Sequence, residues 1–213
     1  MRRLIPLLLV CFTASARADG FYWTEGGGPE NVGDELGAYY HHKTATRLRA
    51  AIGMRRADWA LELFFAGAMN PLNLPENNDG RPVPADAATR APDLLEYGLD
   101  LKKLFPVSPH LAVYLRGSAS LGMGTGTLDT YSGRGLGFGA GAQLEGRGSV
   151  FGLLFPPLFW IIRGGPMMTG AFYLENGYEF YRLHDDGPGP RAKTAIDAQL
   201  THFTVGFALG SDF

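Results

Sequence analysis

The chain has 213 residues, 46% of them hydrophobic, with 19 lysines and arginines against 21 aspartates and glutamates. That length suits one domain of ordinary size and leaves too little for two. The composition provides no cationic face to neutralise phosphates, which excludes nucleic acid as a partner.

The N-terminus has the organisation of a secretory signal peptide. Two arginines follow the initiating methionine, residues 4–12 are apolar, and a small-x-small cleavage pattern ends at Ala18. The apolar stretch falls short of the roughly 20 residues that a membrane-spanning helix needs, which argues against the alternative of an anchor. We therefore predict a signal peptide at 1–18 and a single domain at 19–213.

Cleavage after Ala18 would leave a chain without cysteine. The only cysteine, Cys11, lies within the predicted signal, and Val10 before it is too large for a lipid-anchored protein. Cleavage would also remove three arginines and leave 16 basic against 21 acidic residues, a formal charge of −5. With no disulfides, stability must come from backbone pairing and packing, which a closed sheet supplies.

Apolar residues alternate with polar or small ones along most of the chain, which also contains 30 glycines. A two-residue period is typical of strands with one apolar face, and stretches with helical period are scarce. The pattern predicts eight strands, at 34–42, 46–55, 58–69, 93–103, 109–123, 133–146, 167–184 and 195–209. Within the seventh, Asn176-Gly177 also suits a hairpin turn, which remains an alternative.

The predicted connections alternate in length. Short ones lie at 55–57 and 105–108, and longer ones, rich in Gly, Pro and Asp, at 70–92, 124–132 and 185–194. Short periplasmic turns and long outer loops are typical of bacterial barrels, although 43–45 is short for an outer loop and 147–166 long for a periplasmic turn. We predict an all-β fold, a closed antiparallel up-and-down transmembrane β-barrel of about eight strands.

The chain begins with a signal peptide and ends in an alternating aromatic strand closed by a phenylalanine. In both respects it resembles the small Gram-negative outer-membrane β-barrel proteins, although Ser211 departs from the alternation. The resemblance implies the cell outer membrane, contact with its lipid and recognition by the barrel-assembly machinery. The implied assembly signal consists of Phe203, Val205, Phe207, Leu209 and Phe213. The alternative is the last strand of a soluble sandwich.

If the apolar sets face lipid, the polar sets between them converge inside the barrel. Eight strands enclose a space that side chains just fill, so charges of both signs there are expected to form a closed network. Each lumen arginine should contact a carboxylate, because an isolated buried charge costs several kcal/mol or more. The predicted lumen charges are Arg47, Arg49, Glu62, Glu96, Asp100, Lys102, Arg116, Glu145, Glu175 and Glu179.

We predict no catalytic residue, cofactor or metal site. The candidate histidines are His41, His42, His110, His184 and His202. Some small barrels are lipid-modifying enzymes, but none of these histidines has a nucleophile and an acid at a recognisable spacing. His184 with the two aspartates after it suits a solvated loop better than a cation site.

Residues 150–162 are apolar throughout and broken by two prolines, which excludes a regular strand or helix. We expect them at the membrane interface or against an envelope protein, with Phe155, Phe159 and Trp160 as anchors; the alternative is a plug in the barrel. We favour a structural or interaction role, as a subunit of an envelope assembly. The alternatives are a small-amphiphile binder or conduit, or a lipid-modifying enzyme.

Overall fold

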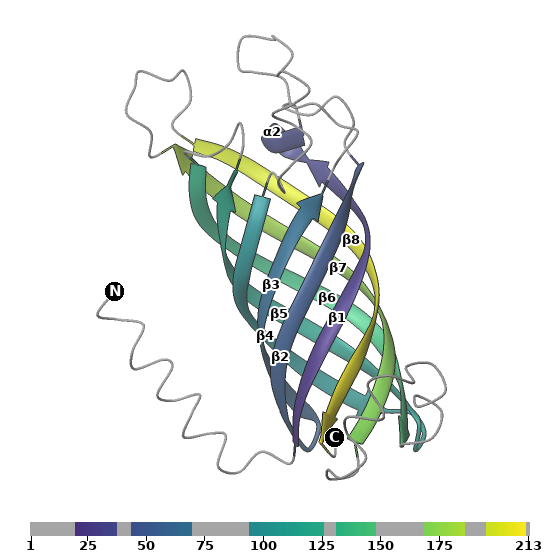
Figure 1. Cartoon of the computed structure of the whole chain (residues 1–213). Coiled ribbons are helices and arrows are strands. Elements are labelled where there is room, and N and C mark those ends of the chain that lie inside the picture. The colour runs from purple at the N-terminus through teal and green to yellow at the C-terminus, as the bar shows by residue number, and fades with distance from the viewer. Residues whose placement is uncertain are drawn as a thin grey trace, which may run out of the picture.

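The computed structural model describes residues 20–37, 44–69, 94–125, 131–147, 168–185 and 195–211. Eight antiparallel strands pair in chain order, and β8 pairs with β1 to close the barrel (Figure 1). The strands are β1 (Gly20–Gly33), β2 (Thr44–Arg56), β3 (Trp59–Met69), β4 (Leu94–Pro106), β5 (Leu111–Gly124), β6 (Tyr131–Arg147), β7 (Met168–Asp185) and β8 (Ala195–Ser211). The predicted closed antiparallel barrel is therefore confirmed.

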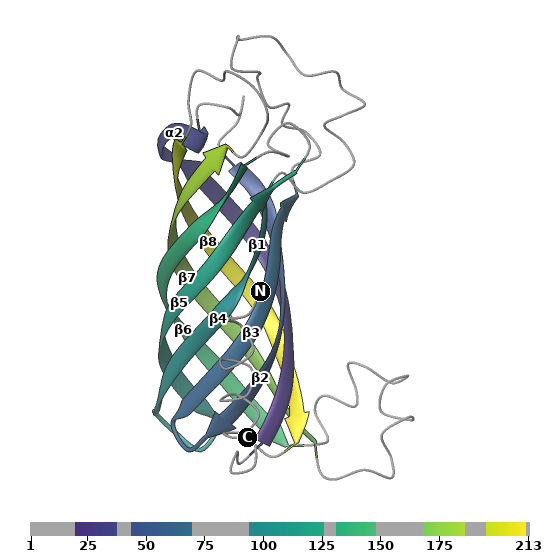
Figure 2. The same ribbon diagram turned by 90° about the vertical axis from the view of Figure 1, so that its left-hand side faces the viewer.

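The two ends of the barrel differ. At one end the two residues 57–58 join β2 to β3, and the four residues 107–110 join β4 to β5. At the other end β1 leads into the short helix α2 (Asp34–Gly37), which lies against β8 (Figures 1 and 2). We call these the turn end and the loop end. No helix among the described residues is long and apolar enough to span a membrane.

The predicted first strand at 34–42 is wrong. β1 occupies Gly20–Gly33 instead, 34–37 form α2, and 38–43 lie outside the described residues. The run of three glycines and a proline in β1 has the composition of a loop. A Cβ at Gly28, however, would overlap the carbonyl oxygen of Phe203 on β8. Glycine is required where β1 approaches β8 this closely. Because these glycines interrupt the alternation of apolar residues, the sequence pattern did not predict the strand.

The alternative hairpin at Asn176-Gly177 is also wrong, because β7 is continuous. Asn176 pairs with Ala140 of β6 on one side and Phe203 of β8 on the other. The seven strands from β2 to β8 begin and end within three residues of the predicted positions. The connection predicted at 147–166 lies almost entirely outside the described residues.

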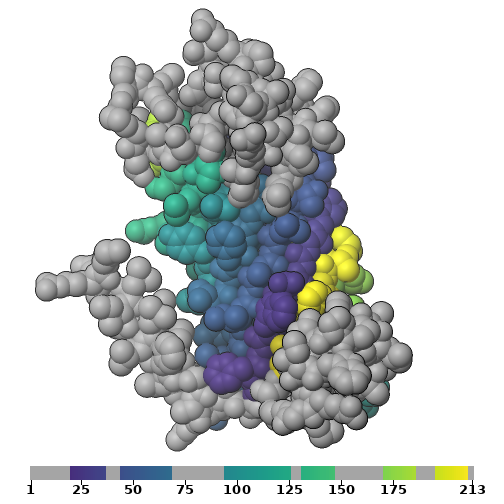
Figure 3. Space-filling view, in the orientation of Figure 1, coloured from purple at the N-terminus to yellow at the C-terminus, as the bar shows by residue number. Residues whose placement is uncertain are grey.

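The barrel is apolar outside and mostly polar inside. On β5, Leu115 faces outward and is 57% exposed, whereas Tyr114 and Arg116 on either side of it are 2% and 3% exposed. The same alternation runs along β2, where it brings leucine and isoleucine to the surface. Figure 3 shows β2 beside β1 on this face of the barrel. A continuous apolar exterior of this kind suits the hydrocarbon of a bilayer.

Replacing Gly28 by valine is expected to prevent closure between β1 and β8. The added carbon atoms would meet the backbone of Phe203, which is held in the sheet and has no room to shift. We expect the variant to lose most of the heat-modifiable band that marks a folded barrel on an unheated gel. The matched control is Gly117→Val, because a Cβ at Gly117 meets nothing within 4 Å. Equal folding of both variants would contradict this account.

Candidate functional site

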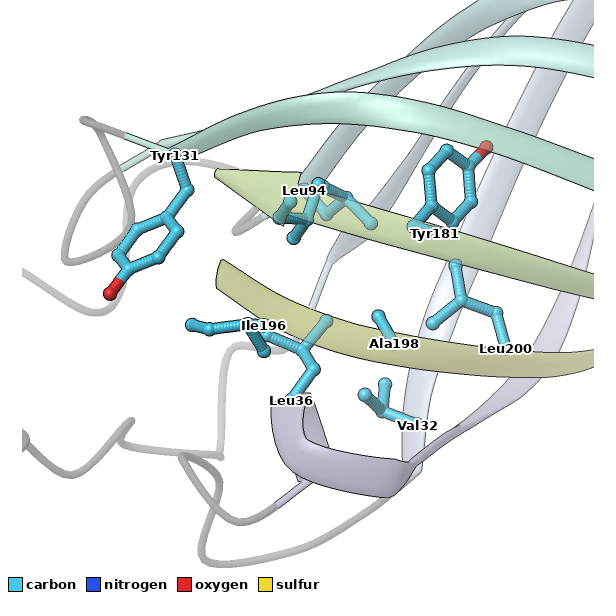
Figure 4. Close-up of a cluster of buried hydrophobic side chains, with 9 residues drawn as sticks. Val32, Leu36, Leu94, Tyr131, Tyr181, Ile196, Ala198 and Leu200 are labelled. Carbon is cyan, nitrogen blue, oxygen red and sulfur yellow. The ribbon is translucent and has the colours of Figure 1, made fainter. Parts of the chain in front are cut away.

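The candidate site is the interior of the barrel, which side chains fill in three layers. The layer at the loop end is apolar. Leu36 of α2 is 1% exposed and packs with Val32, Leu94, Ile196 and Leu200 (Figure 4). The short helix therefore closes this end of the lumen with a buried leucine.

The upper part of the middle layer is organised by Arg47 on β2. Its guanidinium donates to Glu30 at 2.7 Å (Nη1 to Oε2) and to Glu96 at 2.8 Å (Nη2 to Oε2), and it lies 3.3 Å from Glu179. The Tyr181 hydroxyl lies 2.8 Å from Glu96 and 3.1 Å from Glu179. None of the four charged side chains is more than 1% exposed. One arginine thus joins β1, β2, β4 and β7 across the lumen.

Arg116 on β5 continues the network toward the turn end. It donates to Asp100 and to Glu179, both at 3.2 Å, and its Nε lies 3.3 Å from Glu175. Its Nη2 is also 3.2 Å from Nε2 of His202 on β8. Glu179 therefore connects the Arg116 cluster to the Arg47 cluster.

Arg49 and Lys102 share Glu62 at the lower edge of the network. Glu62 accepts from Arg49 at 2.8 Å and from Lys102 at 2.7 Å, and Arg49 also donates to Asp100. The guanidinium of Arg49 lies over the ring of Phe64, 5.1 Å from its centroid, which adds a cation–π contact. Each lumen cation thus has at least one carboxylate partner.

The turn end is closed by tyrosines and a small apolar cluster. Tyr22 donates to Glu62 at 2.9 Å, and Tyr114 donates to Glu175 at 3.0 Å. Tyr114 also packs with buried Leu104. A cavity of about 20 Å³ beside Tyr22 and Lys102 has room for about one water molecule. The interior is therefore occupied at both ends as well as at its centre.

The structure brings nine of the ten predicted lumen charges into this network: Arg47, Arg49, Glu62, Glu96, Asp100, Lys102, Arg116, Glu175 and Glu179. The tenth, Glu145, lies near the turn end and pairs with Arg55 at 2.7 Å instead. Sequence reasoning missed Glu30, because β1 was not recognised. It considered His202 only as a candidate catalytic histidine and left it out of the lumen set, whereas this residue occupies a buried position of β8 opposite to the predicted apolar face.

The other predicted positions lie on the barrel surface or outside the described residues. Phe203 and Val205 face outward on β8 and are 43% and 50% exposed, in line with the alternation of that strand. The structure does not describe Phe213 or the anchors Phe155, Phe159 and Trp160.

Of the candidate histidines, the structure describes His110, His184 and His202, whereas His41 and His42 lie outside the described residues. His202 lies 3.4 Å from Glu179 and 3.4 Å from the Thr204 hydroxyl, but it is only 1% exposed. His110 and His184 are exposed, in the β4–β5 turn and on β7 respectively. Within the described ranges, no three His, Cys, Asp or Glu side chains are arranged to hold a metal ion.

Comparisons with known proteins identify a fold. No protein-family model matches the sequence, and no curated protein matches it. Among solved structures, neisserial surface protein A (NspA) is 15% identical over 91% of this chain and 97% of its own, with a TM-score of 0.51. Ail of Yersinia pestis is 12% identical over 90% and 97%, with a TM-score of 0.42. The likeness to NspA shows that the chain has the fold of small outer-membrane β-barrels, as the resemblance predicted.

Replacing Arg47 by methionine is expected to destabilise the barrel strongly. The change would leave Glu30, Glu96 and Glu179 buried without their shared cation, and breaking a buried ion pair in this way costs about 3–5 kcal/mol. Urea unfolding of the protein in liposomes measures the loss. Arg182→Met is the control, because its ion pair with Asp197 is exposed and worth about 0–1 kcal/mol. Similar urea midpoints of unfolding for both variants would argue against the conclusion that the charge network stabilises the barrel interior.

Proposed function

We propose that the chain is an outer-membrane barrel, closed to diffusion, that has a structural or interaction role in the cell envelope. The observation that carries this proposal is the filled lumen, in which Arg47 and Arg116 each hold carboxylates from more than one strand. Eight-stranded barrels enclose only enough space for side chains, and here those side chains are paired and buried. A channel or an enzyme pocket would need space that the network occupies.

The exterior supports the membrane part of the proposal. Outward-facing apolar residues cover all eight strands, and aromatic rings such as Phe21, Trp59 and Phe105 lie close to the turn end. Lys103, which also faces outward there, lies 5.0 Å from the Trp59 ring centroid. Aromatic girdles of this kind mark the membrane–water boundary. We further propose that 1–18 is a signal peptide and that the barrel-assembly machinery recognises the β8 segment.

The closed lumen leaves the loop end and the lipid-facing wall as the surfaces available for contact with other molecules. An envelope partner bound through residues 150–162 remains part of this proposal. A barrel that presents surfaces and does not conduct suits a subunit of an envelope assembly better than it suits a pore.

The closed lumen predicts that the purified barrel does not conduct ions. We expect no steady single-channel current after reconstitution into planar bilayers, together with heat-modifiable mobility in the outer-membrane fraction. Arg47→Ala with Arg116→Ala, which removes two large cations from the lumen, should show transient current if it remains folded. A steady current from the unaltered barrel would refute closure, whereas a soluble protein without a mobility shift would refute the membrane assignment.

A groove on the outer wall favours a second candidate function, the binding of a small amphiphile. The groove measures about 1020 Å³ and has an apolar floor that includes Leu99, Leu136 and Phe180. Arg134 and Arg182 lie directly opposite each other on β6 and β7 at its loop-end edge. Like charges in cross-strand pairs repel. Asp197, which lines the groove 3.9 Å from Arg182, offsets part of that repulsion, and an acidic headgroup between the two arginines would relieve the rest.

Dodecyl phosphate is a suitable probe for the groove. Its binding to the barrel in nanodiscs, followed by titration calorimetry, should weaken about tenfold in Arg134→Gln with Arg182→Gln, because two charge-assisted contacts are lost. Arg56→Gln, an exposed change at the turn end, is the control. Unchanged affinity in the double variant would remove the second candidate.

A further inference from the structure

β1 carries a carboxylate on the lipid-facing wall of the barrel. Glu25 is exposed and lies on the outward face of β1, between Ala50 of β2 and Phe207 of β8 in register. The ring of Trp23, next but one along the strand, packs against Phe207 with centroids 5.7 Å apart. Figure 3 shows β1, in purple, at the surface between β2 and β8. Aromatic and aliphatic groups therefore surround this acid.

The register of the sheet places Glu25 at mid-height of the apolar band. A single row of outward-facing, directly paired residues crosses the wall obliquely from the turn end to the loop end. In order, it consists of Leu111, Leu144, Phe172, Phe207, Glu25, Ala50, Phe65, Tyr97, Leu121 and Arg134. Glu25 is the fifth of these ten residues, and no other acidic or basic side chain precedes Arg134 in the row. Its depth therefore corresponds to the middle of the bilayer.

No described residue forms a hydrogen bond or ion pair with the Glu25 side chain. Lipid chains provide neither donors nor cations, and ionisable groups at this depth usually face a partner. The neighbouring lumen shows the contrast, because Glu30 on the same strand is paired with Arg47. Among the described residues the Glu25 carboxyl therefore has no partner, and the surrounding lipid chains supply none.

We propose that this wall, centred on Glu25, is the contact surface between two copies of the chain, and that the two Glu25 carboxyls hydrogen-bond to each other. The inference rests on the proposed membrane location. Two copies inserted in the same direction hold Glu25 at the same depth, so a twofold axis along the membrane normal brings the residues face to face. With at least one carboxyl protonated, its O–H donates to the other carboxyl.

The surroundings of Glu25 permit this contact. The cross-strand neighbour Ala50 carries only a methyl group, and Gly27, the next outward position on β1, has no side chain. Small residues allow the backbones of membrane segments to approach closely, which hydrogen bonding between short side chains requires. Phe207 and Ile52 flank the acid and supply apolar contact around the pair.

Cysteine cross-linking in bilayers tests the proposal on the full barrel. In a Cys11→Ser background, Ala50→Cys places a thiol beside Glu25. Gly117→Cys places one at mid-height on β5, four strands from β1 and Glu25, on the opposite wall. After reconstitution at high lipid-to-protein ratio, a membrane-permeant bis-thiosulfonate reagent should give a covalent dimer at least fivefold more abundant for Ala50→Cys. Adding Glu25→Leu should abolish that excess, and adding Glu25→Gln, which keeps a donor and an acceptor, should retain most of it.

Heat-modifiable mobility of each variant separates the two levels of inference. If the protein without the cysteine and Glu25 substitutions fails to insert into bilayers as a folded barrel, the proposed membrane location is wrong. If the variants fold and insert but cross-link equally at positions 50 and 117, or at neither position, the proposed dimer is wrong. This holds even if some other molecule binds Glu25. If the excess of covalent dimer for Ala50→Cys persists in Glu25→Leu, the proposed carboxyl pair is wrong. The pair is also wrong if Glu25→Gln abolishes this excess as completely as Glu25→Leu does.

Discussion

The pairing of buried charges across the lumen is the constraint on which the rest of the barrel depends. Backbone hydrogen bonds connect each strand only to its two neighbours, whereas Arg47 connects β2 to β4 and to β7. Closing the sheet pairs the backbone of β1 with that of β8, which leaves no edge whose N–H and C=O groups would face hydrocarbon unpaired. The ion pairs add contacts between strands that are not neighbours, and a strand that separates would leave a buried charge unpaired.

The network holds more acids than fixed cations. Within the described part of the chain, the buried lumen set has four basic residues, Arg47, Arg49, Lys102 and Arg116, and six acidic ones, Glu30, Glu62, Glu96, Asp100, Glu175 and Glu179. Tyrosine hydroxyls supply further donors where acids are crowded. Tyr181 lies between Glu96 and Glu179, and Tyr114 donates to Glu175. Tyrosines in the lumen thus act as hydrogen-bond donors, in addition to the aromatic residues that lie on the exterior.

The two-residue period predicted much of the fold because a closed sheet sorts alternate residues onto opposite faces. Seven strands and the inward side of Arg47, Arg49 and Arg116 follow from that rule. The rule failed for β1, because its close approach to β8 requires glycine, and glycine removes the apolar side chains that would show the two-residue period. The partners of each charge also escaped prediction, since the contact of Arg47 with Glu179 depends on strand tilt and register, which alternation does not specify.

β1 shows how much depends on this sorting. Glu25 and Glu30 are five positions apart, an odd number, so the pleat directs them to opposite faces. Glu30 reaches Arg47 and is 0% exposed, whereas Glu25 is exposed on the outer face beside Phe207 in register. A shift of one residue in the β1 register would exchange their environments and remove Glu30 from Arg47. The inward acid therefore fixes the register of β1, and the exposed position of Glu25 follows from the pairing of Glu30.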